Sequence, residues 1–279
     1  MRRRRGRRCF PCPPREERNS MEESVADRYS RQILFAPIGP AGQARIAASR
    51  AVLIGCGALG STLANALVRA GVGQLDIIDA DRVTWSNLQR QTLFDEEHAR
   101  RNRFKAEAAA EVLAGINPDS RVTVHRARLS AHNAASLIGH PAVVLDATDN
   151  FSTRYLINDY CVREGLPWIY GGCAAAYGNT ITVVPGRTPC LRCLFPEPPP
   201  AEANLTCHQV GIIGPIAHVV ASIQGAEALK FLSGHAEAVV PRLITIDLWD
   251  NRFHSTPLAP PDPDCPCCAR RQFSFLEPA

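Results

Sequence analysis

The stretch AVLIGCGALG, residues 51–60, decides the fold of this chain. It opens with a continuous apolar run, which is typical of a strand buried on both faces of a parallel sheet. Glycines at 55, 57 and 60 permit a tight turn, a close approach of the backbone to a ligand, and close packing of a helix on a strand. The stretch therefore predicts a strand over 51–55 that passes through a glycine loop into a helix.

The residues that follow complete a βαβ unit. Leucines and alanines recur at helical spacing up to Ala70, glycines at 71 and 73 supply stop signals, and a second strand over 75–79 ends on Asp79. A helix start offers unpaired N–H groups to a phosphate, and a carboxylate at this distance can bind a ribose. We predict a nucleotide site that includes Gly55, Gly57, Ala58, Gly60 and Asp79. Taken alone, the unit suits NAD as well as ATP, and glycines that serve packing alone are a further alternative.

Strands and helices alternate through most of the remaining chain. The patterns predict helices over 103–115, 152–164 and 215–233, and strands over 121–125, 142–146, 167–171, 179–185 and 243–248. The Pro-rich stretch 195–201 predicts an exposed crossover loop, which extends to about 210. This alternation predicts a Rossmann-like α/β fold, with a doubly wound, mostly parallel sheet extended by C-terminal strands.

The charge of the chain is unevenly distributed. The net charge is +4 over 279 residues, but residues 1–20 carry eight Arg and two Glu, so the remainder is close to neutral. We predict a disordered basic tail over 1–20, with Met21 as an alternative start and one folded unit over 21–279. The near-neutral remainder argues against nucleic acid as a partner. No apolar run reaches the roughly 18 residues of a membrane span, so we expect a cytoplasmic protein.

Residues beyond the second strand favour ATP over NAD. Ser86-Asn-Leu-Gln-Arg90 carries amides and a guanidinium fork suited to phosphate oxygens. Lys105 is one of only two lysines, which suggests a need for a compact ammonium. Asp149 follows the strand 142–146, where a carboxylate can hold Mg²⁺ against phosphates; an N-cap role for Asp149 or Asn150 is the alternative. Transfer of AMP to a carboxylate needs these charges, because an anionic carboxylate must approach an anionic triphosphate. Hydride transfer does not need them.

Several motifs together resemble the bacterial MoeB/ThiF/HesA family, whose members are relatives of the ubiquitin-activating enzymes. They are RYSRQ at 28–32, GCGALG at 55–60, IDAD at 78–81, SNLQRQ at 86–91, Lys105, INP at 116–118 and TDN at 148–150. The resemblance spans about residues 27–268. The family usually has glycine where this chain has Ala58, so the contact made there is open.

The resemblance implies a homodimeric enzyme that uses ATP and Mg²⁺ to adenylate a small ubiquitin-like sulfur-carrier protein ending in Gly-Gly. Asp79 would bind the ribose and Asp149 the Mg²⁺, while Arg31 would reach the nucleotide of the partner subunit. The phosphate ligands would be Asn87, Arg90 and Lys105, and the nucleotide site would also include Asp81, Ser86, Gln89 and Asn150. Sulfur would come from a separate donor protein. A tRNA-modifying dehydratase of the same family, an NAD-dependent oxidoreductase and a zinc-bearing scaffold are the competing hypotheses.

Four of the eleven cysteines form two CxxC pairs, Cys190 with Cys193 and Cys265 with Cys268, separated by 71 residues. Tetrahedral Zn²⁺ takes four thiolates, and each CxxC turn presents two. We predict a zinc site that ties down the C-terminal segment, with a redox disulfide as the alternative. Cys207, next to His208, is a candidate nucleophile for carrying sulfur or forming an adduct with the carrier.

Overall fold

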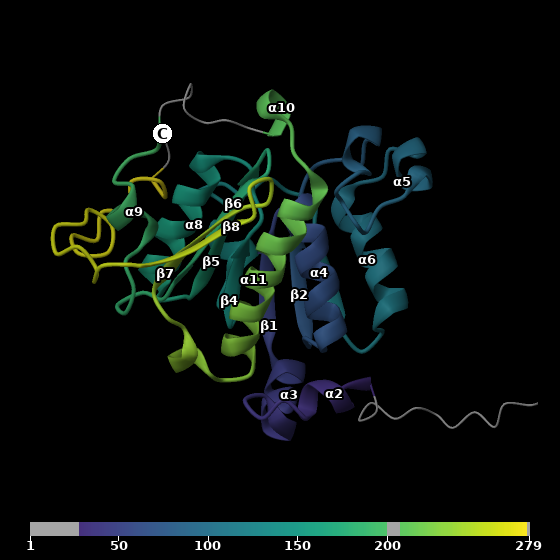
Figure 1. The fold of residues 1–279 in the computed structure, drawn as a ribbon, viewed down its shortest axis with the longest axis horizontal. Coiled ribbons are helices and arrows are strands. Elements are labelled where there is room, and N and C mark those ends of the chain that lie inside the picture. The colour runs from purple at the N-terminus through teal and green to yellow at the C-terminus, as the bar shows by residue number, and fades with distance from the viewer. Residues whose placement is uncertain (1–27, 200–206, 278–279) are drawn as a thin grey trace, which may run out of the picture.

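One eight-stranded sheet forms the centre of the protein, in the order β3-β2-β1-β4-β5-β6-β7-β8, with helices on both faces (Figure 1). The computed structural model of the chain describes residues 28–199 and 207–277. Strands β1 to β5 are parallel, and β6, β7 and β8 extend the sheet by antiparallel pairing. The predicted doubly wound, mostly parallel sheet with C-terminal strands is confirmed.

The strands lie within a few residues of their predicted positions. They are β1 Arg50–Ile54, β2 Gln74–Ile78, β3 Arg121–His125, β4 Val143–Asp146, β5 Trp168–Ala174, β6 Tyr177–Val183, β7 Arg242–Asp247 and β8 Arg252–Pro257. The sequence did not predict β8. Every residue of this edge strand is exposed, so it lacks the apolar pattern that marks a buried strand, and its pairing with β7 defines it.

The helices that the sequence predicted are α4, α6, α8 and α11, and shorter ones connect them. In the described part of the chain the α-helices are α2 Ser30–Ile33, α3 Gly39–Ala48, α4 Ala58–Ala70, α5 Glu96–Arg100, α6 Lys105–Ile116, α7 Ala134–Ile138, α8 Phe151–Glu164, α9 Leu191–Leu194, α10 Cys207–Val210 and α11 Gly214–Leu232. Gly71 ends α4 in the left-handed conformation, as the sequence predicted.

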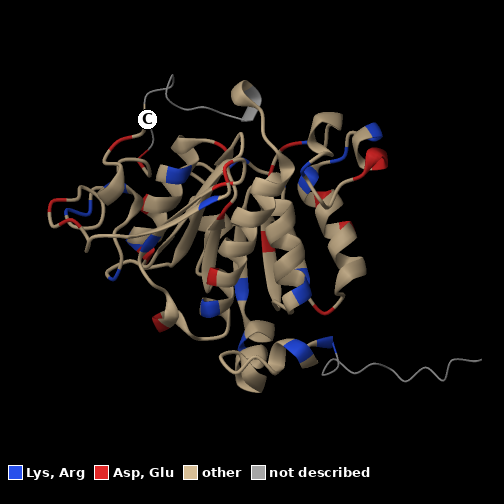
Figure 2. Cartoon of the chain, viewed as in Figure 1, with Lys and Arg blue, Asp and Glu red and all other residues tan. Residues whose placement is uncertain are grey.

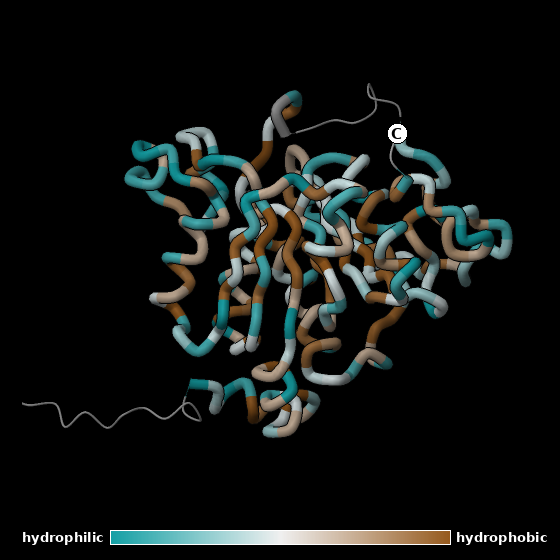
Figure 3. Tube along the Cα trace, turned by 180° about the vertical axis from the view of Figure 1, so that it is seen from behind, coloured by the Kyte–Doolittle hydropathy of each residue, from teal (hydrophilic) through white to brown (hydrophobic). Residues whose placement is uncertain are grey.

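The sheet separates two apolar cores. Side chains of α4, α6 and α11 pack on one face, and those of α7, α8 and the C-terminal segment pack on the other. Figure 3 shows the hydrophobic residues concentrated in the central strands and the helix faces turned toward them. Among the described residues, no helix has the length and apolar character that crossing a membrane requires.

Two of the family-like motifs join the N-terminal segment to α4 and to the end of α6. Asn117 is fully buried, and its Nδ2 donates to Tyr29 Oη and to the carbonyl of Val68, each at 2.8 Å. A side chain on Gly71 would come within 2.5 Å of the Tyr29 ring. Tyr29 and Asn117 therefore have structural roles in these motifs. The tail predicted over 1–20 and residues 200–206 of the crossover loop lie outside the described residues.

Candidate active site

The strand order reverses between β1 and β4, and the candidate site lies at this point. In open α/β sheets, ligands bind beyond the carboxyl ends of the strands at such a reversal. The loops after β1 and β4 are in contact, because a side chain on Gly55 would come within 2.6 Å of the Ala147 carbonyl oxygen. Gly55, Asp79 and Asp149 follow three neighbouring strands, so the structure brings these predicted residues to one edge of the sheet.

The three glycines of the loop have different roles. Gly55 has a φ of +91°, and a side chain on Gly60 would overlap the Gly55 carbonyl, so packing requires both glycines. At Gly57 the nearest atom to an added Cβ is Gln91 Nε2, at 3.7 Å, which leaves room at the start of α4. Ala58 is the first residue of α4 and packs against the apolar core. The loop can therefore admit a ligand at Gly57 despite the alanine that follows.

Asp79, which the sequence predicts to bind a ribose, is hydrogen-bonded to the glycine loop. Its Oδ2 accepts from the Cys56 amide and its Oδ1 from the Asp81 amide, both at 2.7 Å. Burial raises the pKa of the Asp79 carboxyl, against the opposing charge of Lys105. Asp79 thus shapes the glycine loop as well as facing the site, a double role that the sequence pattern did not indicate.

Asp81 holds two cations at the same edge of the sheet. Its carboxylate lies 3.3 Å from Lys105 Nζ and 2.8 Å from Arg128 Nη2. The Lys105 side chain is largely buried, and its amide donates to the Asp81 carbonyl. Asp81 therefore positions Lys105 beside Asp79. Arg128 was not predicted, because three residues after β3 it has no sequence signal of its own.

The segment 86–90 begins within a single 3-10 turn, Trp85–Asn87. The Asn87 Oδ1 accepts from the Thr84 amide at 3.1 Å, and the Arg90 Nη1 donates to the Ser86 carbonyl at 2.8 Å. Asn87 is buried, while Ser86 and Gln89 are exposed. In the free chain, the predicted phosphate ligands Asn87 and Arg90 thus stabilise the shape of their own segment.

The structure separates the two roles considered for the TDN turn. Asn150 is the N-cap of α8, since its Oδ1 accepts from the Thr153 amide at 2.9 Å. Asp149 is exposed at the turn. Its carboxylate is therefore not needed to cap the helix and can take part in ligand binding.

Arg31 lies near the amino-terminal ends of the parallel strands, whereas these groups lie at the carboxyl ends. It is an exposed residue of α2, and α2 packs with α3 below the start of β1, whereas the glycine loop follows the other end of that strand (Figure 1). Within one chain, Arg31 therefore does not join the nucleotide site.

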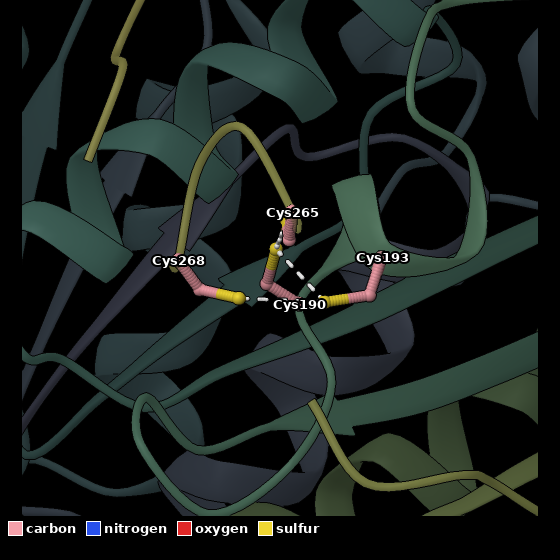
Figure 4. Close-up of side chains that lie close together, drawn as sticks. All are labelled: Cys190, Cys193, Cys265 and Cys268. Carbon is pink, nitrogen blue, oxygen red and sulfur yellow. Dashed lines mark hydrogen bonds between the residues drawn. The ribbon is translucent and has the colours of Figure 1, made fainter. Parts of the chain in front are cut away.

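The four cysteines of the two CxxC pairs form one cluster. Their Sγ atoms all lie within 4.8 Å of one another, with Cys190 to Cys265 at 3.6 Å and Cys193 to Cys268 at 3.4 Å. The side chains from α9 and from the C-terminal turn point toward a common centre (Figure 4). This donor set fits one tetrahedral metal ion. Cys267 is not one of these four converging cysteines, and its Sγ accepts from Asn158 Nδ2 at 3.3 Å.

The remaining cysteine candidate, Cys207, is the first residue of α10, but its side chain lies outside the described part of the structure. Near α10 the surface has a groove of about 580 Å³, lined by the β5–β6 turn, the segment before α11 and the end of β7. Trp249 and Tyr177 are its exposed aromatic residues, and Asp247 and Asp250 its acidic ones. The sequence patterns did not predict this groove.

The fold and the site together define a nucleotide-binding α/β enzyme with a separate four-cysteine centre. Residues 29–267 match the ThiF family, and the chain belongs to that family. The sulfur carrier protein ThiS adenylyltransferase of Bacillus subtilis is 48% identical over 253 residues, covering 90% of this chain and 74% of that protein. The SAMP-activating enzyme E1 of Haloferax volcanii is 40% identical over 258 residues, covering 92% of this chain and 94% of that enzyme. The chain is accordingly an adenylyltransferase.

Solved structures show the same fold. The structure of Escherichia coli MccB with ATP has a TM-score of 0.74 at 24% identity, covering 87% of this chain and 74% of that one. MccB with MccA-N7isoASN gives a TM-score of 0.75 at 23% identity, covering 88% and 75%. At this identity the likeness establishes the arrangement of the elements only.

Proposed function

We propose that this enzyme uses ATP to adenylate the C-terminal glycine of a small ubiquitin-like sulfur-carrier protein ending in Gly-Gly, with release of pyrophosphate. The main support is that the predicted residues Gly57, Asp79 and Asp149 follow three neighbouring strands at the strand reversal. Lys105 pairs with Asp81, two residues after Asp79. The relatives named after sulfur carriers support the choice of acceptor. The activated carrier would then receive sulfur from a separate donor protein.

The residues of the site fit the parts of ATP in turn. Asp79 would accept from the ribose, and the open space at Gly57 would admit the phosphates to the start of α4. Lys105, Arg90 and Asn87 would hold phosphate oxygens, and Asp149 would hold Mg²⁺. The metal would neutralise charge as the carboxylate approaches the triphosphate. For Lys105, this role requires its ammonium to turn from Asp81 toward the phosphates, and its single 3.3 Å ion pair makes such a movement plausible.

The groove between Tyr177 and Trp249 is our proposed path for the C-terminal segment of the carrier. It lies at the end of β5 and the start of β6, on the edge of the sheet that carries the nucleotide site. An extended Gly-Gly tail has no side chains to obstruct a shallow groove, and exposed aromatic residues favour contact with a protein surface.

We propose that Cys190, Cys193, Cys265 and Cys268 bind Zn²⁺ as a structural centre. The cluster is partly buried, and all four positions are filled by cysteine, so no position remains open for a substrate. Cys207 remains our candidate for accepting sulfur or forming an adduct with the carrier. A Cys207→Ala enzyme that keeps full sulfur transfer in a reconstituted assay would contradict that role.

The test of the main proposal is ATP–pyrophosphate exchange measured with and without a Gly-Gly carrier protein. We expect exchange that depends on the carrier and disappears when its last glycine is removed, and that falls strongly in Asp149→Asn. Exchange stimulated by tRNA would favour the dehydratase alternative. Binding of NAD with no exchange would favour the oxidoreductase.

We further propose that two copies of the chain assemble, with Arg31 completing the partner's site. The separation of α2 from the glycine loop within one chain motivates this assignment. Arg31→Ala and Lys105→Met should each be nearly inactive alone. Co-refolded in equal amounts, they should regain about a quarter of the wild-type rate, because half the dimers would contain one intact site. No recovery, with dimers present, would contradict a role for Arg31 across subunits.

A further inference from the structure

A buried ion pair lies directly beneath the turn that carries Asp149. Asp146, at the end of β4, is fully buried, and its Oδ2 lies 3.3 Å from Nε of Arg154, whose side chain is 7% exposed. Arg154 projects from the first turn of α8. Its guanidinium also lies about 5 Å from the centres of the Phe151 and Tyr170 rings.

Asp146 and Arg154 both form hydrogen bonds to Thr148 in this turn. Asp146 Oδ1 accepts from the Thr148 amide at 2.8 Å and from the Thr148 hydroxyl at 2.6 Å. Arg154 Nη2 donates to the Thr148 carbonyl at 2.7 Å and to the Gly171 carbonyl on β5 at 3.2 Å. The amide, the hydroxyl and the carbonyl of Thr148 are thus all fixed, immediately before Asp149.

The stability of the fold does not explain why such a pair is present. Burying two charges costs about as much as their attraction returns, and apolar residues of similar volume are often at least as stabilising. Within the described part of the chain, Asp146 Oδ2 and Arg154 Nε make no aligned hydrogen bond. These two atoms stay without a hydrogen bond to any described residue, while other atoms of both side chains bond to Thr148. This indicates that the pair maintains the shape of the turn.

We propose that Asp146 and Arg154 are positioning residues that hold the 147–150 turn, so that Asp149 is already oriented for a divalent cation bound with the triphosphate. The inference rests on the proposed Mg²⁺ role of Asp149. Residues that orient a metal ligand in this way commonly account for roughly 10- to 100-fold in metal affinity.

The chain provides a matched control on the same helix. Asp159 of α8 pairs with Arg192 at 3.7 Å, and both side chains are buried. These two residues hold the C-terminal segment, since Asp159 accepts from the Phe275 amide and Arg192 donates to the Gln272 carbonyl. The double variants Asp146→Asn with Arg154→Met, and Asp159→Asn with Arg192→Met, each remove one buried pair without leaving a lone charge.

Two readouts test the proposal in the full chain. The first is hydrogen exchange of the 147–150 amides in the nucleotide-free protein, together with the urea midpoint. The second is the Mg²⁺ concentration that gives half-maximal ATP–pyrophosphate exchange. For the Asp146/Arg154 variant we expect lost protection of the turn and a rise of roughly tenfold or more in the Mg²⁺ requirement. The Asp159/Arg192 variant should keep the wild-type protection of the turn and the wild-type Mg²⁺ requirement, while its urea midpoint falls because the C-terminal segment loses its bonds to both residues.

Wild-type protection of the turn in a folded Asp146/Arg154 variant overturns the proposal. If that variant does not fold, Arg154→Lys decides. In Arg154, Nε faces Asp146 while Nη2 reaches both carbonyls, and the single nitrogen of a lysine that keeps the ion pair cannot also hold the carbonyls in this way. Protection and Mg²⁺ requirement unchanged in Arg154→Lys also overturn it. If Asp149→Asn leaves the Mg²⁺ requirement unchanged, the proposed metal role of Asp149 fails, and the hydrogen exchange of the nucleotide-free protein still decides whether the pair holds the turn.

Discussion

Replacing Cys268 by serine removes one proposed metal ligand and should release the C-terminal segment from the body of the protein. Apart from the cysteine cluster, five hydrogen bonds join residues 267–275 to α8 and α9: two from Arg192, one to Asp159, one from Asn158, and one from Arg271 to the Arg163 carbonyl. At roughly 0.5–1.5 kcal/mol each, they contribute about 2.5–7.5 kcal/mol. A structural zinc contributes roughly 10–16 kcal/mol. The metal therefore outweighs these bonds as the anchor of the segment.

The assay combines metal content with limited proteolysis. Wild-type protein should carry one zinc per chain and resist cleavage between 258 and 277, whereas Cys268→Ser should lose the metal and be cleaved there first. The sheet should stay folded at this stage, because the core on its α4, α6 and α11 face packs without the segment, and only the core on the opposite face loses contacts with it.

Cys267→Ser is the matched control in the same turn. Cys267 is fully buried, yet its Sγ contacts Asn158 and not the common centre of the cluster. It should therefore keep its zinc and its protease resistance. The ligand assignment would be refuted if Cys267→Ser lost the metal while Cys268→Ser retained it. Full zinc and full resistance in Cys268→Ser would refute the anchoring role itself.

Three further outcomes are expected. Lys105→Met should lower the exchange rate roughly 10²- to 10³-fold with little change in the urea midpoint, because its partner Asp81 is half exposed. Gly57→Ala should fold and bind ATP more weakly in calorimetry, whereas Gly60→Ala should give little folded protein on gel filtration, since its methyl would overlap the Gly55 carbonyl. The pKa of Asp76 is lower than its usual value of 3.8: burial acts to raise it, but hydrogen bonds from Gln74 and Arg50 and the charge of Arg50 lower it further. Asp76→Asn should therefore reduce the free energy of unfolding by roughly 1.5–3 kcal/mol at pH 7. In urea titrations, the difference between wild type and variant should disappear as the pH falls from the usual pKa of 3.8 through the lower pKa of folded Asp76.

The sequence predicted the elements whose burial leaves a pattern. β1 and β4 are continuous apolar runs, and α4 lies between a glycine loop and a glycine stop, so each could be placed within a few residues. β8 could not be predicted, because an exposed edge strand is defined by its neighbour and not by its own side chains. The sequence also did not show that Asn150 rather than Asp149 caps α8, because both residue types can cap a helix and the backbone of the turn decides which one does.

The candidate site divides in a similar way. Residues recognised by type and spacing, such as Asp79 and Lys105, lie near one another beyond the end of β2, since the charge of Lys105 acts on the Asp79 carboxyl. Residues that act through other residues were missed, since Arg128 and Arg154 contact carboxylates 47 and 8 positions away in the chain. A sequence pattern identifies groups suited to a ligand, but only the folded chain shows which groups hold them in place.

Asp79 shows why this distinction matters for interpreting variants of the site. Both of its carboxylate oxygens already accept backbone amides, one from the glycine loop and one from the turn to Asp81. A ribose must therefore use the lone pairs that remain on these two oxygens, whereas an amide has only one acceptor oxygen. Asparagine at this position would lose a ribose acceptor and one support of the loop at Cys56 together. Weakened phosphate binding in such a variant would consequently be no evidence that Asp79 touches the phosphates, because the loop that receives them depends on the same side chain.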